Sequence, residues 1–284
     1  MHLNLKGKLI SLDEPLVMGI VNYTEDSFYD GGRYFSEEKL AEKIKQQVME
    51  GADIIDIGAM STRPGADEIS EMEELCRISH LLDLLNDQFP DILVSVDTWR
   101  ASVAEMAVGK GSAMINDVSG GTFDEEMIPM IGKLKVPYCL MHTPAKPDVM
   151  QQRIHYDSLI SDIIYFFGEQ LAKLKAVGVN DIMLDPGFGF GKTLEQNYLL
   201  MNNLQAFSVF NLPLLVGISR KSMIYNLLKI TPDEALTGTI ALNTVALFNG
   251  ANILRVHDVR EARDTIGVVK AVKGEEKARS IIHG

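Results

Sequence analysis

The sequence has few cysteines and no long apolar run, and both shortages exclude classes of protein. Only two of its 284 residues are cysteines, Cys76 and Cys139, and they form neither a CxxC pair nor a disulfide framework. We expect both to be reduced core residues. The N-terminal stretch lacks the apolar region of a signal peptide, and no apolar run approaches the roughly 18 residues of a spanning helix. We therefore expect a cytoplasmic protein.

Positive charge is also scarce. The chain carries 27 Lys and Arg against 39 Asp and Glu, a formal net charge of −12. This balance disfavours nucleic acid and anionic membranes as partners. A small anionic ligand would need local cations that override the negative background, so we expect small-molecule substrates and look for such cations.

Several motifs of well-known chemistries are missing. The six histidines include no HxH or HExxH pair, which argues against a zinc centre. The stretch "VGISRKS" fails the GxSxG pattern of a nucleophile elbow at its second glycine. "LDPGFGFGKT" (184–193) ends like a phosphate loop, but the required first glycine falls on Pro186. Nothing beside Lys221 marks it as desolvated, so a Schiff base is not expected.

What the sequence does contain is a regular alternation of two patterns. Eight short runs are rich in Leu and β-branched residues without polar alternation, which is typical of strands buried on both faces of a parallel sheet. They span 16–22, 53–58, 92–97, 113–117, 137–142, 181–185, 213–219 and 252–257. Eight helical patterns follow them, at 36–51, 67–89, 99–109, 124–133, 156–177, 195–208, 233–249 and 259–276.

This alternation predicts an α/β fold, a single-domain (β/α)8 TIM barrel over residues 16–284. Residues 1–15 fall outside the repeat and predict a short β-hairpin that caps the N-terminal end of the barrel. A doubly wound open sheet is the alternative.

Polar and charged residues gather where the predicted strands end. In a barrel these C-terminal ends form one rim, which carries the chemistry. Any one of them could be a helix cap, but caps on seven strands would not converge on one pocket. The residues are Asn22, Asp97, Asn116, Asp117, His142, Asp185, Ser219, Arg220, Lys221, Arg255 and His257.

These side chains divide into two chemistries. Asp97, Asn116 and Asp185 can hydrogen-bond the amino and amide edges of a flat heterocycle. A second group is cationic or nearly so and suits a phosphate or carboxylate: Arg63, Lys221, Arg255 and His257. Ser61, Thr62 and Arg63 add an oxyanion grip in a Gly/Pro-rich loop. Asn22 offers a neutral oxygen for Mg²⁺.

The chain resembles the dihydropteroate synthase family from about Met18 to Val268, and eight pieces in order carry the resemblance. They are "MGIVNYTEDSFYDGG", "GADIIDIGAMSTRPGA", "VSVDT", "INDVSGG", "LMH", "LDPGFGFGKT", "LLVGISRKSMI" and "NGANILRVHDV". The resemblance implies a TIM barrel and a transferase of folate biosynthesis. This enzyme would condense 6-hydroxymethyl-7,8-dihydropterin diphosphate with p-aminobenzoate, giving 7,8-dihydropteroate and diphosphate.

The resemblance also implies roles for individual residues. The pterin site would be Asp97, Asn116, Asp185 and Lys221, and the diphosphate site Asn22, Ser61, Thr62, Arg63, Arg255 and His257. The p-aminobenzoate site would be Phe28, Arg63, Pro64, Phe190, Lys221 and Ser222, with Asn22 as the ligand of a Mg²⁺ cofactor. The catalytic set would be Asp97, Asp185, Lys221, Arg255 and His257, with minor roles for His142 and Asp26. The family further implies a homodimer through the late helices.

The implied mechanism is dissociative. Diphosphate leaves first, stabilised by Mg²⁺, Arg255 and His257. The neutral arylamine then attacks the pterin methylene, so no strong general base is assigned. Departures from the family pattern lie in two loops, at Tyr23 and Glu25 and at Ala59 and Met60, and they leave loop closure and sulfonamide sensitivity open.

Two other functions remain open from the residues. One is a pterin-binding methyltransferase that acts with a corrinoid protein. It would share the pterin acids but would not need the anion-binding "SRKS" and "RVHD" pieces. The other is a pterin-binding protein without catalysis, which loss of Arg255 or His257 would have favoured.

Overall fold

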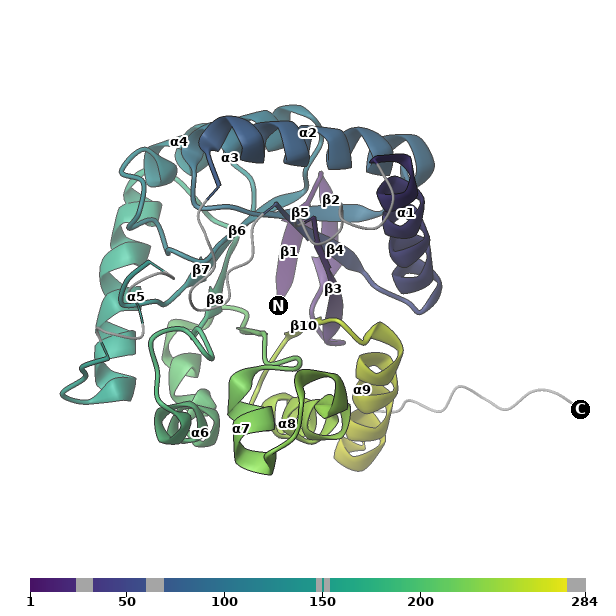
Figure 1. The fold of residues 1–284 in the computed structure, drawn as a ribbon. Coiled ribbons are helices and arrows are strands. Elements are labelled where there is room, and N and C mark those ends of the chain that lie inside the picture. The colour runs from purple at the N-terminus through teal and green to yellow at the C-terminus, as the bar shows by residue number, and fades with distance from the viewer. Residues whose placement is uncertain (24–32, 60–68, 147–149, 151–153, 275–284) are drawn as a thin grey trace, which may run out of the picture.

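The computed structural model describes residues 1–23, 33–59, 69–146, 150 and 154–274. Within them, eight parallel strands form a barrel with helices around its outside (Figure 1). The strands are β3 (Leu16–Asn22), β4 (Ile54–Gly58), β5 (Leu93–Asp97), β6 (Met114–Asp117), β7 (Tyr138–Met141), β8 (Ile182–Asp185), β9 (Leu215–Val216) and β10 (Ile253–Val256). The predicted TIM barrel is confirmed, and the open-sheet alternative is wrong.

The strand order shows how the barrel closes. The hydrogen-bonded order is β8-β7-β6-β5-β4-β3-β10-β9. A single parallel bridge between Leu184 and Leu214 then joins β8 to the chain just before β9. β9 is the shortest strand, and much of the predicted run 213–219 lies outside regular strand structure. Because the strands are parallel and closed, all their carboxyl ends lie on one rim.

Nine α-helices lie in the described residues, one more than predicted. They are α1 (Arg33–Met49), α2 (Glu71–Gln88), α3 (Ala101–Gly109), α4 (Met127–Leu134), α5 (Leu159–Ala176), α6 (Leu194–Asn202), α7 (Ser222–Leu228), α8 (Leu236–Phe248) and α9 (Val259–Lys273). Short 3₁₀ helices span Leu204–Phe210 and Pro232–Glu234. The extra helix is α7, whose seven residues are too few for a helical period to stand out in the sequence.

The N-terminal hairpin is also present, as β1 (His2–Leu5) and β2 (Lys8–Ser11). Its strand β1 alternates between exposed and buried residues, and Leu3 and Leu5 are the buried ones. Both leucines belong to a cluster with the first residues of barrel strands, including Ile54, Met114 and Ile253. The hairpin therefore packs against the N-terminal end of the barrel, opposite the rim of strand ends.

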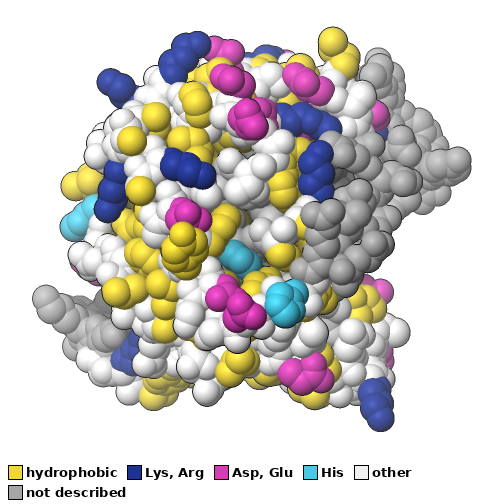
Figure 2. Space-filling view, turned by 90° about the vertical axis from the view of Figure 1, so that its left-hand side faces the viewer, with side chains coloured by type: hydrophobic (Ala, Val, Ile, Leu, Met, Phe, Trp, Pro, Cys, Tyr) yellow, Lys and Arg dark blue, Asp and Glu magenta, His cyan; other side chains and the backbone are white. Residues whose placement is uncertain are grey.

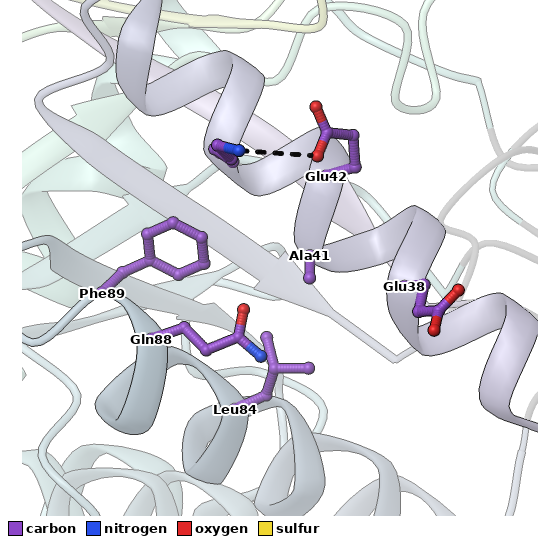
Figure 3. Close-up of a pocket in the computed structure, with 7 residues that line it drawn as sticks. Glu38, Ala41, Glu42, Leu84, Gln88 and Phe89 are labelled. Atoms are coloured by element: carbon purple, nitrogen blue, oxygen red, sulfur yellow. Dashed lines mark ion pairs between the residues drawn. The ribbon is translucent and has the colours of Figure 1, made fainter.

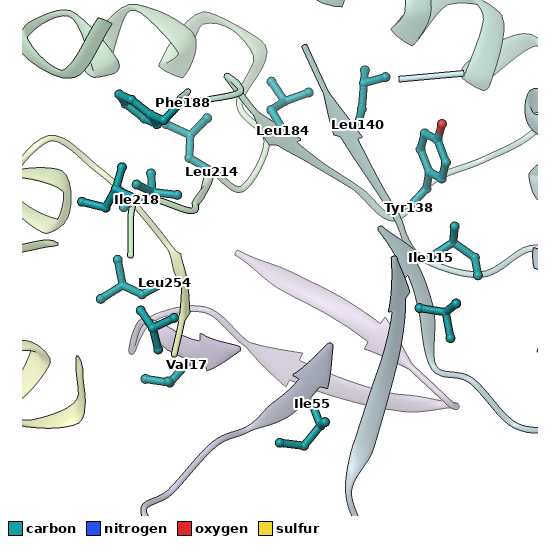
Figure 4. Packing of buried hydrophobic residues seen from close by; sticks show 14 of the residues in the cluster. Val17, Ile55, Ile115, Tyr138, Leu140, Leu184, Phe188, Leu214, Ile218 and Leu254 are labelled. Atoms are coloured by element: carbon teal, nitrogen blue, oxygen red, sulfur yellow. The ribbon is translucent and has the colours of Figure 1, made fainter. Parts of the chain in front are cut away.

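The main core lies between the strands and the helices, and Figure 4 shows part of it. Strand residues alternate between this layer and the barrel interior, because side chains on a strand point to opposite faces in turn. In β4, Ile55 and Ile57 belong to the outer core, while Ile54 packs with the hairpin cluster. The same alternation turns Asp56 into the barrel interior, where an apolar residue would be expected.

The outside of the molecule corrects one prediction. Cys139 is buried, but Cys76 is exposed on α2, so the expectation that both are core residues is wrong for Cys76.

On the face that Figure 2 presents, acidic and basic side chains are interspersed with hydrophobic ones. None of the helices in the described part of the chain is both long and apolar enough to cross a membrane.

Candidate active site

A buried charge cluster occupies the barrel interior below the rim. The Nε of Arg255, on β10, donates to Oδ2 of Asp56 at 2.6 Å, and its Nη2 donates to Oδ2 of Asp97 at 2.8 Å. Asn116, on β6, donates from Nδ2 to the same Asp56 oxygen at 3.0 Å. We call these four residues the Arg255 cluster. Four strands thus bring together three predicted site residues, Asp97, Asn116 and Arg255.

Asp56 is the member of the cluster that the sequence analysis missed. Its side chain is fully buried, and its second oxygen, Oδ1, has no hydrogen-bond partner among the described residues. The available signal was a lone carboxylate in the middle of the apolar strand "DIIDIG". A buried carboxylate is retained only where a cation offsets its cost, and Arg255 is that cation.

Burial and like charge act on Asp97. Burial raises the pKa of Asp97 to about 7, Arg255 opposes the shift, and Asp56 adds to it. Burial works against the charge of Arg255 as well, but Asp56 and Asp97 raise its pKa above the ordinary value. The cluster therefore holds a permanent cation beside a carboxyl that titrates near neutral pH.

A second pair of interacting groups is Asp185, the last residue of β8, and Lys221, which directly precedes α7. Burial raises the pKa of the Asp185 carboxyl, and Lys221 opposes this shift. Burial lowers the pKa of Lys221 to about 8, while Asp185 raises it. Lys221 is therefore desolvated, contrary to our expectation, but remains mostly protonated at pH 7. Its Nζ donates to the carbonyl oxygen of Phe188 and lies 4.6 Å from the centre of the Phe190 ring.

The glycine-rich turn after β8 connects these groups. Its three glycines have φ angles of +73° at Gly187, +81° at Gly189 and +54° at Gly191, a region that favours glycine. A Cβ at Gly187 would lie 2.0 Å from the carbonyl oxygen of His142, so no larger residue fits there. The Gly187 N–H donates to Oδ1 of Asp185 at 2.8 Å. The turn is thus packed against Asp185 and the backbone of His142.

His257 was expected to be cationic or nearly so, and in the buried site its ring is neutral near pH 7. Burial lowers its pKa to about 4, and Arg255 adds to the shift. The Ser219 hydroxyl oxygen accepts from the His257 backbone N–H at 3.1 Å and lies 3.1 Å from Nδ1. The Ser219 hydroxyl can donate its own proton to Nδ1, and in that arrangement the ring proton of His257 lies on Nε2.

Among the other predicted residues, Arg220, Asn22 and Ser222 lie in the described part of the chain, and six lie outside it. Arg220 is drawn to Asp258 by two hydrogen bonds of 2.9 and 2.8 Å, so its charge is already offset. Asn22 is half-buried at the end of β3. Ser222 is the first residue of α7. The remaining predicted residues lie outside the described part of the chain: Asp26, Phe28, Ser61, Thr62, Arg63 and Pro64.

Arg77, on α2, is another residue that the sequence analysis missed. Its Nη1 donates to the carbonyl oxygens of Tyr23, at 3.4 Å, and Ala59, at 3.2 Å. These carbonyls belong to the chain just after β3 and β4. Arg77 therefore ties together the starts of the two loops that carry the departures from the family pattern.

A groove on the outside of the barrel is separate from these groups. It lies between α1 and α2, has a volume of about 420 Å³, and includes Glu42 and Lys45, paired at 4.0 Å (Figure 3). Its remaining lining is Glu38, Ala41, Leu84, Gln88 and Phe89. None of the buried, perturbed carboxyls lines it, so the rim is the better candidate for the chemistry.

Comparisons with known proteins identify one family. The family model described as pterin binding enzyme matches residues 18–257. The dihydropteroate synthase of Escherichia coli K12 is 40% identical over 273 residues, covering 95% of this chain and 96% of that protein. The enzyme of Synechocystis sp. is 42% identical over 259 residues, covering 90% and 89%.

Solved structures are similar over the same length. The Yersinia pestis dihydropteroate synthase in complex with a sulfonamide drug is 40% identical, with a TM-score of 0.90, covering 96% of this chain and 100% of that one. The Xanthomonas albilineans enzyme with 4-aminobenzoic acid is 36% identical, with a TM-score of 0.88, covering 96% and 98%.

Proposed function

The chain belongs to the pterin-binding enzymes, in the dihydropteroate synthase family, and we propose from this premise how its own residues carry out the reaction. The reaction is the condensation of 6-hydroxymethyl-7,8-dihydropterin diphosphate with p-aminobenzoate, a transferase step of folate synthesis. The observation that supports the assignment of roles is the buried Arg255 cluster beside Asp185 and Lys221.

We assign pterin recognition to Asp97, Asn116 and Asp185. The ring offers amino and amide N–H groups in one plane. A hydrogen bond from such a neutral donor is stronger when the acceptor is an ionised carboxylate than when it is neutral. All three side chains are almost fully buried, so a ring bound there is shielded from water and each hydrogen bond gains strength. Asn116 and Asp97 are both held by the cluster, which fixes their orientation before substrate arrives.

Loss of diphosphate is the bond-breaking step. The bond between the pterin methylene and the bridging oxygen breaks, and the electron pair leaves with that oxygen. Arg255 has five N–H protons, of which two are donated to Asp56 and Asp97, so three remain for an anion. His257, neutral with its proton on Nε2, acts as a hydrogen-bond donor to a phosphate oxygen and not as a counter-charge.

The amine of p-aminobenzoate then attacks the methylene cation. An arylamine is unprotonated near pH 7, so its lone pair is available without a base, and the amine proton passes to water after the new carbon–nitrogen bond forms. Phe190, 8% exposed, offers a flat apolar wall for the ring. Lys221 over that wall, with Ser222 beside it, adds polar contacts for this substrate.

A Mg²⁺ ion suits the available ligands only if the substrate supplies most of them. Among the described residues, no group of three or more His, Cys, Asp or Glu side chains could hold a metal ion. Asn22 would provide one neutral oxygen, and Mg²⁺ commonly keeps waters and binds through substrate phosphates. When bound, the ion would neutralise charge on the departing diphosphate.

The activity and its metal requirement are tested in one assay. With p-aminobenzoate present, diphosphate release from the pterin diphosphate should be coupled to formation of a pteroate product. EDTA should lower the rate of this reaction at least tenfold. Excess Mg²⁺ should restore it, and Asn22→Ala should raise the Mg²⁺ concentration needed for half-maximal rate. Tight pterin binding without turnover would contradict the assigned function. Full activity in EDTA would contradict only the proposed requirement for Mg²⁺.

We also propose a homodimer formed through the late helices. Val245 and Phe248 on α8 are 41% and 45% exposed, and Leu228 on α7 is 51% exposed. Such side chains are typical of a buried contact between subunits. Sedimentation should therefore give about twice the mass of the 31.5 kDa chain. Phe248→Glu should shift it toward monomer, whereas Met72→Glu, an equally drastic change on α2, should not. A monomeric wild type would contradict the proposal.

A further inference from the structure

Lys192 is a buried lysine that the reaction described above does not use. Burial lowers its pKa to about 7 and Asp185 opposes this shift, so the charged ammonium is present at and below neutral pH. It belongs to the stretch "LDPGFGFGKT", where it occupies the place of a phosphate-loop lysine, yet it is only 4% exposed. Its ammonium has three protons, and three acceptors surround it. They are the carbonyl oxygens of Gly187 at 2.9 Å and Phe190 at 3.1 Å, and Nδ1 of His142 at 3.1 Å.

His142 is held so that it can accept from this ammonium. Its ring is 5% exposed and packs edge-to-face on Phe166, with 5.0 Å between ring centres, and near Tyr156 at 5.9 Å. When Lys192 is charged, its ammonium only donates, so Nδ1 then carries the lone pair and the ring is neutral, with its proton on Nε2. Burial, with Lys192 adding to the effect, lowers the pKa of His142 well below its usual value, in line with this requirement.

The two carbonyls that Lys192 binds belong to the two ends of the glycine turn. Between them lie Phe188, whose carbonyl accepts from Lys221, and Gly189, which packs against the Lys221 side chain. Phe190 itself carries the ring under the Lys221 ammonium. One ammonium therefore binds both ends of this four-residue turn and, through it, supports the positions of two of the groups assigned to p-aminobenzoate, Phe190 and Lys221.

We propose that Lys192 is a positioning residue for p-aminobenzoate, which holds Phe190 and Lys221 in place through the carbonyls of Gly187 and Phe190 and through neutral His142. The proposal rests on the function assigned above. It also explains why the lysine of a sequence so like a phosphate loop is turned inward. Its protons are all directed at the protein's own acceptors, so it has none to offer a phosphate.

Lys192→Met tests this directly, since methionine keeps an apolar stem of similar length and removes the ammonium. We expect the KM for p-aminobenzoate to rise about tenfold or more, while the Kd for 6-hydroxymethylpterin changes less than threefold. A merely structural role would weaken both substrates together. Lys133→Met, on the outer surface at α4 and paired with Glu105, is the matched control and should leave both constants unchanged.

A second pair of variants tests the acceptor without touching Lys192. Asparagine and leucine have nearly the same shape, but only His142→Asn keeps an acceptor close to the position of Nδ1. In His142→Asn, the KM for p-aminobenzoate should stay within about threefold of the wild-type value. In His142→Leu, it should rise as much as in Lys192→Met. This pair decides the matter if Lys192→Met does not fold.

Three results would overturn the proposal: an unchanged KM in Lys192→Met, equal effects of the two His142 variants, or an equal loss of pterin binding. If the wild-type protein makes no pteroate product at all, the assigned function fails instead. The two failures are therefore distinguishable.

Discussion

Arg255→Met is expected to lower kcat/KM for the pterin diphosphate by at least a thousandfold, about 4 kcal/mol of transition-state stabilisation. Two effects combine. The departing diphosphate loses the only cation of the Arg255 cluster, and Asp56 and Asp97 lose the donor that holds both at 2.6 and 2.8 Å. Removing one partner of a buried ion pair also typically costs about 3 to 5 kcal/mol of folding stability.

Steady-state kinetics and thermal unfolding check this expectation together. Arg220→Met is the matched control, because Arg220 is an arginine at the same rim whose guanidinium donates to Asp258 and to the carbonyl oxygens of Pro232 and Asp233. It should keep activity within about tenfold. Arg255→Lys keeps a charge but loses the planar, two-partner geometry, so it should recover only part of the activity. An Arg255→Met enzyme within tenfold of wild type would show that the cluster is not part of the catalytic site.

Asp56→Asn is expected to lower kcat/KM about a hundredfold and to change its pH dependence. The amide oxygen can still accept from both Arg255 and Asn116, which donate to a single Asp56 oxygen, but the neutral amide no longer offsets the charge of Arg255. Asp56 also contributes to the raised pKa of Asp97. Its removal leaves Arg255 to act on Asp97 with less opposition, so the pKa of Asp97 should fall.

The sign of the pH effect follows from the proposed role of Asp97 as an ionised acceptor. In the wild type, pterin affinity should weaken as the pH falls through about 7, because Asp97 becomes protonated. In Asp56→Asn the same weakening should occur at lower pH. The measurement is the Kd of 6-hydroxymethylpterin between pH 5 and 8, since this ligand has no phosphate that titrates in that range. If pterin affinity weakens at the same pH in both proteins, Asp56 does not influence the pKa of Asp97.

Much of the fold was predictable because its signals are local. A strand buried on both faces is a continuous apolar run, and eight of these alternate with helical patterns. The rim was predictable for a topological reason, since parallel strands in a closed barrel all end on one side. The short helix α7 and the two-residue strand β9 were not, because elements of that length carry no readable period.

The predicted rim residues also needed corrections that depend on neighbours distant in sequence. His257 was expected to be cationic or nearly so, but burial near Arg255 lowers its pKa to about 4. Lys221 was expected to be solvated, but the turn after β8 and Phe190 cover it. Charge state depends on the surrounding dielectric and on nearby charges, and neither is visible in a residue's own sequence context.

By itself the sequence determined the fold class, the family and the set of polar residues at the strand ends, because periodicity and motif order are properties of the chain alone. Only the tertiary structure decided how those residues are paired. Asp56 and Arg255 are 199 positions apart, and they meet because β4 and β10 face the same barrel interior. Lys192 looked like part of a nucleotide motif, and its three acceptors show that it serves the turn instead. A hydrogen bond depends on distance and direction in space, and the closure of the barrel sets both.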